Sequence, residues 1–90
     1  MATLRERKTY REQVLQVLYE AVEGNRLLGI TGAKLGHDLR MPEQDLAAAC
    51  TYLAGEGLIT VDWEPGNTPA MVTLTHEGIR RMEADEEERG

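Results

Sequence analysis

Residues 53–83, LAGEGLITVDWEPGNTPAMVTLTHEGIRRME, place a helix end, a hairpin and a helix start in immediate succession. Gly55 and Gly57 are expected to end the first helix, because glycine enters a sharp reversal into a strand at little steric cost. LITVDW alternates as a strand does, EPGNTP has the composition of a turn in which Gly66 takes positive φ, and AMVTLT predicts the returning strand. Thr75 is expected to cap the helix HEGIRRMEADEEER, and Gly78 to let that helix approach the sheet or the first helix closely.

Two helices are predicted before residue 41. Apolar residues recur at helical spacing over residues 9–23, and Gly24 and Asn25 are residue types that close a helix. LLGIT then forms a link in which Ile30 makes a strand of one or two residues. Thr31 is expected to cap the short helix GAKLGHDL.

A third helix is predicted from Pro42, which fits the first helical position because its missing N–H costs nothing there. Glu43 and Asp45 fall in its first turn, where the helix dipole favours negative charge. The predicted order is therefore helix, short strand, helix, helix, strand, turn, strand, helix. The apolar residues expected to face inward are Tyr10, Val14, Val17, Leu18, Ala21, Val22, Ala33, Leu35, Leu39, Leu46, Cys50, Leu53, Ile59, Val61, Trp63, Val72, Leu74, Ile79 and Met82.

The composition is that of one small globular domain. The chain has 90 residues, 41% of them hydrophobic, which is enough for a single modest core. The one cysteine gives no disulfide and no metal cluster, which fits a reducing cytosol. No run approaches the roughly 20 apolar residues of a membrane span. The start MATLRERKTY lacks the apolar centre of a signal peptide, so a cytoplasmic protein is expected.

Charge is spread unevenly within a net charge of −6. Residues 1–11 carry four basic side chains against Glu6 alone, whereas residues 41–75 carry acids and no base. The tail at 84–90 is again strongly acidic. An acidic surface repels phosphate backbones, so this distribution bears directly on nucleic-acid binding.

The order of elements resembles the winged helix-turn-helix superfamily over about residues 10–83. LAGEGLITVD is similar to the junction that follows a recognition helix, and DWEPGNTPAM is similar to the wing of the hairpin. VTLTHEGIRRME is similar to the strand, cap and helix that end small bacterial winged-helix regulators. The resemblance implies a predominantly α (α+β) fold in a single winged-helix domain, residues 1–90, with a basic N-terminal segment at 1–9 and an acidic tail at 84–90.

The same resemblance implies where DNA would be contacted, because the superfamily usually reads DNA with the third helix and grips it with the wing. The corresponding helix positions are Glu43, Gln44, Ala47, Ala48 and Thr51, and the wing positions are Glu64, Asn67 and Thr68, with Trp63 beside the turn. The expected phosphate contacts are Arg5, Arg7, Lys8 and Arg11, as an arm reaching a groove, together with Lys34 and Arg40 near the second helix.

The third helix departs from the superfamily's pattern, because it carries acidic side chains at the positions where Lys or Arg would neutralise DNA phosphates. Gln44 suits adenine and Thr51 suits a base or a phosphate, but Lys and Arg are absent from residues 41–75. Two functions therefore remain open. One is a transcription-regulator-like protein, a homodimer bound to double-stranded DNA. The other is a protein–protein interaction adaptor that lost conventional DNA binding and meets a partner with a basic surface.

The remaining notable side chains are assigned structural roles. Cys50 is expected to be a buried, inert thiol, and Trp63 to pack across the hairpin or against the third helix. His37 and His76 lack metal-ligand spacing, so no metal, cofactor or catalytic residue is expected. The acidic tail is interpreted as a frayed, solvated helix end.

Overall fold

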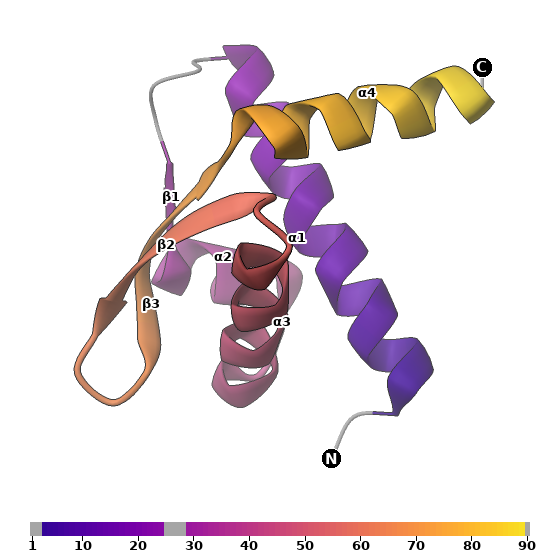
Figure 1. Ribbon diagram of the computed structural model, residues 1–90. Helices are drawn as coiled ribbons and strands as arrows, with labels where there is room; N and C mark the ends of the chain where they lie inside the picture. The colour runs from indigo at the N-terminus through magenta and orange to yellow at the C-terminus, as the bar shows by residue number, and fades with distance from the viewer. Residues whose placement is uncertain (1–2, 25–28, 90) are drawn as a thin grey trace.

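The computed structural model describes residues 3–24 and 29–89, and it follows the predicted order of helices and strands (Figure 1). The predicted closing residue Asn25 and the first part of the predicted link, Leu27 and Leu28, lie outside the described residues. The elements are α1 (Leu4–Gly24), β1 (Ile30–Thr31), α2 (Gly32–Leu39), α3 (Glu43–Gly55), β2 (Ile59–Glu64), β3 (Thr68–Leu74) and α4 (His76–Arg89).

The strands form one antiparallel sheet in the order β1-β3-β2. On one side of β3, Ile30 pairs with Val72, and on the other Ile59 pairs with Leu74. The turn between β2 and β3 contains Gly66 at φ 89°, as predicted, followed by Asn67 at φ 62°. We call the β2–β3 hairpin the wing; its tip projects at the lower left of Figure 1, to the side of the helices.

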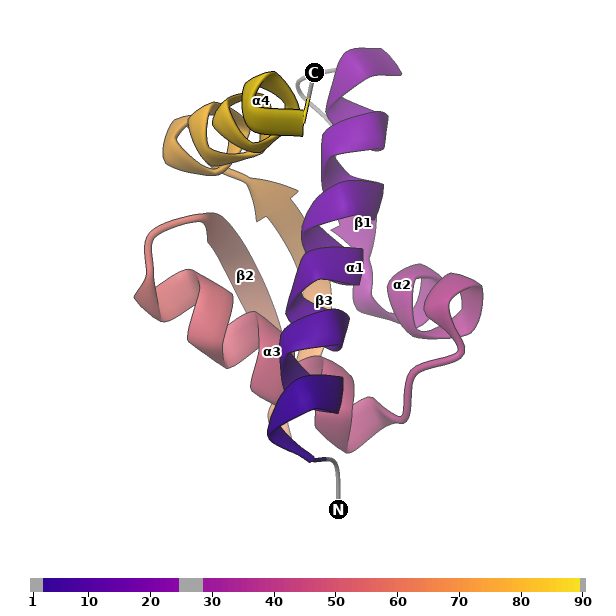
Figure 2. The same cartoon turned by 90° about the vertical axis from the view of Figure 1, so that its right-hand side faces the viewer.

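The core lies between α1, α3 and the sheet, and α2 and α4 complete it. Figure 2, seen from the side of α1, shows that helix standing in front of the other elements. Most of the predicted inward-facing residues are buried or packed against the core. Leu15 and Tyr19 are also buried but were not predicted, because α1 packs against α3 and α4 as well as the sheet and so buries a wider stripe.

The prediction that Trp63 and Ala33 face inward is wrong. Trp63 is 42% exposed, because a register irregularity between Asp62 and Trp63 interrupts the alternation of the two faces of β2. Ala33 is exposed, and the preceding residue, Gly32, is buried against Pro69 in its place.

The start of α1 also differs from the prediction. The helix begins at Leu4 because Thr3 and Glu6 form a capping box: the Glu6 amide donates to Thr3 Oγ1, and the Thr3 amide donates to Glu6 Oε1, each over 3.1 Å. The hydrogen bond from the Thr3 amide lowers the pKa of the Glu6 carboxyl, and the Thr3 side chain lowers it further. The basic residues from Arg5 to Arg11 therefore lie on a helix, and their contact with a DNA groove stays a prediction.

A smaller difference affects α3. Pro42 is the N-cap residue of α3, with ψ 145°, so the helix starts one position later than predicted. The acidic tail belongs to α4, which reaches Arg89 as predicted, and Glu86, Glu87 and Glu88 are exposed.

Thr75 joins the first turn of α4 to the link between α3 and β2. Its amide donates to the Leu58 carbonyl over 3.0 Å, and its hydroxyl donates to the Gly57 carbonyl over 2.6 Å. The same hydroxyl accepts from the Gly78 amide over 3.0 Å, which confirms the predicted cap of α4. Gly78 lies directly against the Leu58 carbonyl and the Leu74 side chain, so the predicted close approach is confirmed.

Gly78→Ala is expected to lower the free energy of unfolding by about 2 kcal/mol or more, because the new methyl group would overlap the Leu58 carbonyl. Gly55 supplies a matched control, since it is also helical but a Cβ there would meet nothing within 4 Å. Gly55→Ala should be neutral or stabilising by up to about 1 kcal/mol. Denaturant unfolding of both variants measures the difference, and equal effects would contradict the close approach.

Cys50 is fully buried, as predicted, and burial raises the pKa of its thiol to about 11. We expect no reaction with a disulfide reagent in the folded protein at mildly alkaline pH, and complete reaction after unfolding. Because the folded pKa lies above the ordinary value of 9.0, this thiol's contribution to stability is present below pH 9.0 and is lost as pH rises toward about 11. Thr60→Cys provides an exposed thiol for comparison; equal labelling rates at both positions would contradict the burial.

Candidate nucleic-acid interface

The exposed face of α3 lies between the wing and the first turns of α1. On the wing side, the Thr68 hydroxyl donates to Glu43 Oε1 over 2.8 Å. On the other side, Arg7 and Arg11 border a shallow depression together with Asp45 and Ala48 of α3. In Figure 1 the wing tip, the start of α3 and the start of α1 all reach the lower edge of the molecule.

The predicted α3 residues share this surface only in part. Glu43, Gln44, Ala48 and Thr51 are exposed, whereas Ala47 is half-buried. The Thr51 hydroxyl donates to the Ala47 carbonyl over 2.8 Å, so its proton is used within the helix and only its lone pairs face outward. Gln44 therefore offers both a donor and an acceptor on the exposed face, where Thr51 offers an acceptor.

The first turns of α1 supply the cations that α3 lacks. Arg7 and Arg11 are four residues apart, which places both on one side of the helix. The Arg11 guanidinium lies 3.5 Å from the centroid of the Tyr52 ring on α3, a cation–π contact that fixes its position. Lys8 lines a neighbouring hollow that Arg11, Tyr52 and Glu12 also border. We call Arg7, Lys8 and Arg11 the basic flank of α3.

The sequence predicts that these cations contact phosphates, but it does not predict their position beside α3. The i, i+4 spacing of Arg7 and Arg11 was visible, but their adjacency to Tyr52 depends on how α1 crosses α3. Arg5, the remaining predicted contact of this segment, borders a separate hollow with Leu4 and Thr9.

The cations of α2 are placed differently. Lys34 Nζ forms an ion pair with Asp38 over 3.0 Å, and this contact, with a smaller contribution from His37, lowers the pKa of Asp38. Arg40 ends α2 in the left-handed conformation at φ 52°, with its amide donating to the His37 carbonyl. Arg40 is exposed. The cations predicted to contact phosphates therefore lie on two elements, on α1 and on α2 with its C-cap residue Arg40.

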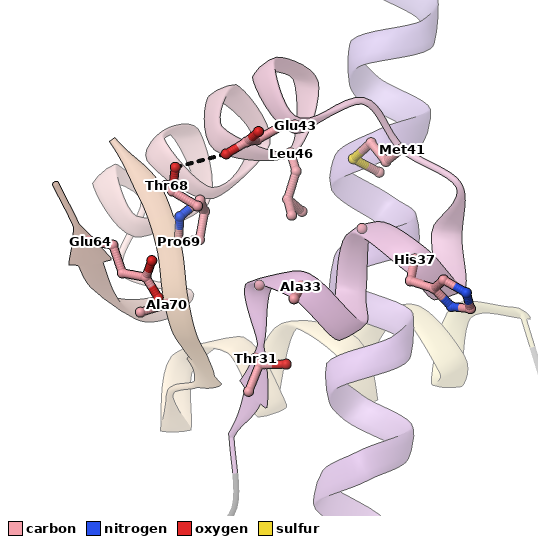
Figure 3. A pocket seen from close by; sticks show the side chains of 12 residues that line it. Thr31, Ala33, His37, Met41, Glu43, Leu46, Glu64, Thr68, Pro69 and Ala70 are labelled. Carbon is pink, nitrogen blue, oxygen red and sulfur yellow. Dashed lines mark hydrogen bonds between the residues drawn. The ribbon is translucent and has the colours of Figure 1, made fainter. Parts of the chain in front are cut away.

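The wing side of α3 is acidic. Glu43 and Glu64 both line a groove of about 550 Å³ between α2, the start of α3 and the wing (Figure 3). Thr68 is half-buried at this position, while Asn67 and Trp63 are exposed on the wing. The exposed face of α3 therefore has a basic flank on α1 and an acidic flank formed by Glu43 and Glu64.

The next two features are groups of possible metal ligands and helices that could span a membrane. Over residues 3–24 and 29–89, no group of three or more His, Cys, Asp or Glu side chains is placed to hold a metal ion. Within the same residues, every helix is too short or too polar to pass through a membrane.

Comparison with known proteins establishes the fold. No protein-family model matches the chain, and no curated protein matches it significantly. Among solved structures, the chain is similar to a MarR family regulator from Neisseria meningitidis, with a TM-score of 0.62 and 26% sequence identity over 87% of this chain and 54% of that one. The chain thus spans about half the length of that regulator. The likeness and the order of elements together confirm the winged-helix fold predicted from the sequence.

The hydrogen bond between Thr68 and Glu43 is expected to hold the wing against α3. Thr68→Val removes the donor and should lower the free energy of unfolding by about 0.5–1 kcal/mol while speeding amide hydrogen exchange near the wing tip. Thr60→Val, the same change at an exposed position of β2, serves as the control and should leave exchange at the tip unchanged. Identical exchange in the two variants would show that the bond does not restrain the wing.

Proposed function

We propose that the protein is a non-catalytic winged-helix regulator that associates with double-stranded DNA through α3 and its basic flank. The adjacency of Arg7 and Arg11 to the exposed face of α3 is the observation that carries this proposal. α3 itself has no Lys or Arg to neutralise phosphates, but these cations of α1 lie beside it. The likeness to a MarR family regulator at 26% identity supports a regulatory function.

In the proposed complex, Arg7, Lys8 and Arg11 neutralise phosphates beside α3, and Gln44 and Thr51 lie nearest the bases. Arg5, Lys34 and Arg40 add phosphate contacts from the rest of α1 and from α2. A homodimer would double all of these contacts, and sedimentation velocity measures whether one forms. The single buried cysteine suits a protein that works in the reducing cytoplasm.

Titration with duplex DNA tests the proposal directly. Binding is expected at low salt and should weaken steeply as salt rises, because bound phosphates release counterions. Arg7→Gln/Lys8→Gln should reduce the slope of log affinity against log salt by about 2. No binding at low salt and high protein concentration would overturn the proposal.

The matched control removes the same charge from another element. Arg80 lies on α4, which runs along the upper edge of the molecule in Figure 1, away from the wing tip. Arg80→Gln removes one positive charge, as Arg7→Gln does, but should preserve the salt slope that Arg7→Gln reduces by about 1. A similar change in these two single variants would mean that overall charge, and not the basic flank, controls binding.

A protein–protein adaptor is the second candidate, and the acidic flank favours it. Glu43 and Glu64 border a concave surface that suits a partner with basic side chains. Glu64→Gln separates the two functions. If α3 faces DNA, removing this like charge should raise DNA affinity a few-fold; if the protein is an adaptor, the wild-type chain and the variant should both fail to bind duplex DNA.

A further inference from the structure

The groove on the acidic flank is a wide hollow that the proposed DNA contacts do not use. It is open between α2, the start of α3 and the wing, with a volume of about 550 Å³. Sites for small molecules commonly span about 300–1,000 Å³. Buried apolar side chains from three different segments, Met41, Leu46 and Pro69, contribute to its lining. In Figure 3, Leu46 points from α3 toward α2 into this space.

Small residues keep the groove open. Gly32 lies against the Pro69 carbonyl, so α2 and β3 meet closely at that point. Ala33 on α2 and Ala70 on β3 line the groove with a single methyl group each. The exposed position of Ala33, which the sequence analysis expected to face inward, follows from its place in this wall. Larger side chains at these positions would fill the space.

The charge of the lining has one sign at neutral pH. Glu43 and Glu64 are both exposed carboxylates, and the lining contains no Lys or Arg among the described residues. The Thr68 hydroxyl bonds to Glu43 Oε1, so the second oxygen of that carboxylate is left for another donor. His37 lies at the far end of α2 in Figure 3, where its ring is near Asp38.

We propose that this groove binds a small organic cation, an ammonium or amidinium group carried on an apolar body. The body would displace water from Met41, Leu46 and Pro69, and the cation would bond to Glu43 and Glu64. An anion of the same shape would meet two like charges, and a neutral molecule would lose the charge-assisted bonds. This ligand site is independent of the proposed DNA contacts, which lie on α3 and its basic flank.

A matched set of probes tests the chemistry without DNA. The cation is 4-phenylbutylammonium, the neutral analogue is 4-phenylbutanol and the anion is 4-phenylbutyrate, each titrated into the isotopically labelled protein and followed by amide NMR. The cation should shift amides around the groove, including Gly32, Gly36 and Ala70. The alcohol should bind about tenfold more weakly, in line with the strength of bonds to a charged group, and the anion should not saturate.

Variants locate the site. Glu43→Gln/Glu64→Gln should weaken the cation about tenfold or more, and the amide oxygen introduced at position 43 can still accept from Thr68, so the wing keeps its contact with α3. Glu83→Gln, which changes an exposed acid on α4 outside the groove, should leave affinity unchanged. Ala33→Leu should abolish binding by filling the groove, with unfolding measured separately to confirm that the variant is folded.

Three results would overturn the proposal. The first is an absence of saturable shifts with 4-phenylbutylammonium at millimolar concentration. The second is equal affinity for the cation and 4-phenylbutyrate. The third is unchanged cation affinity in the variant that lacks both carboxylates. Each outcome is independent of whether the protein binds DNA, so the groove and the proposed DNA interface can fail separately.

Discussion

The hydrogen bonds of Thr75 hold together two parts of the fold that are separate in sequence. Through this one residue, the link between α3 and β2, at Gly57 and Leu58, is connected to the first turn of α4, and Gly78 allows the backbones to meet at contact distance. The register of the sheet begins at the same place, where Ile59 pairs with Leu74. The orientation of the wing relative to α3 is therefore set at the base of the hairpin, in a region with little freedom to move.

The wing is also held near its tip. Thr68 bonds to Glu43 in the first turn of α3, and at the base of the hairpin Thr75, directly after β3, bonds to Gly57, two residues beyond the end of α3. A short helix connected at both ends presents a fixed surface to its surroundings. The charges around that surface come from other elements: Arg7 and Arg11 from α1 on one side, and Glu64 from the wing on the other. The separation of charge is thus a property of the tertiary structure and not of α3 alone.

Local signals made much of this fold predictable. Gly57 and Gly66 have the positive φ values that their turns require, and Thr31 and Thr75 cap the helices predicted from their positions. The start of α1 was missed although Thr3 and Glu6 have capping-box spacing, because the apolar stripe begins several residues later.

Other features depend on contacts that no local pattern contains. The exposure of Trp63 follows from an irregularity in pairing between β2 and β3, which periodicity within one strand cannot show. The sequence supplied the residues of the candidate interface, but the placement of Arg11 over Tyr52 depends on the crossing of two helices. The groove is the feature least predictable from a local pattern, because α2, α3 and both strands of the wing each contribute part of its wall.

Trp63 is the only tryptophan of the chain, and it lies on the wing instead of in the core. Its indole is already partly in water in the folded protein, so its emission is a weak indicator of global unfolding and a sensitive indicator of what touches the hairpin. The native chain therefore carries an intrinsic fluorophore on the wing, next to the exposed face of α3. Contact of a nucleic acid or another protein with the wing can be followed by this fluorescence without attaching a dye.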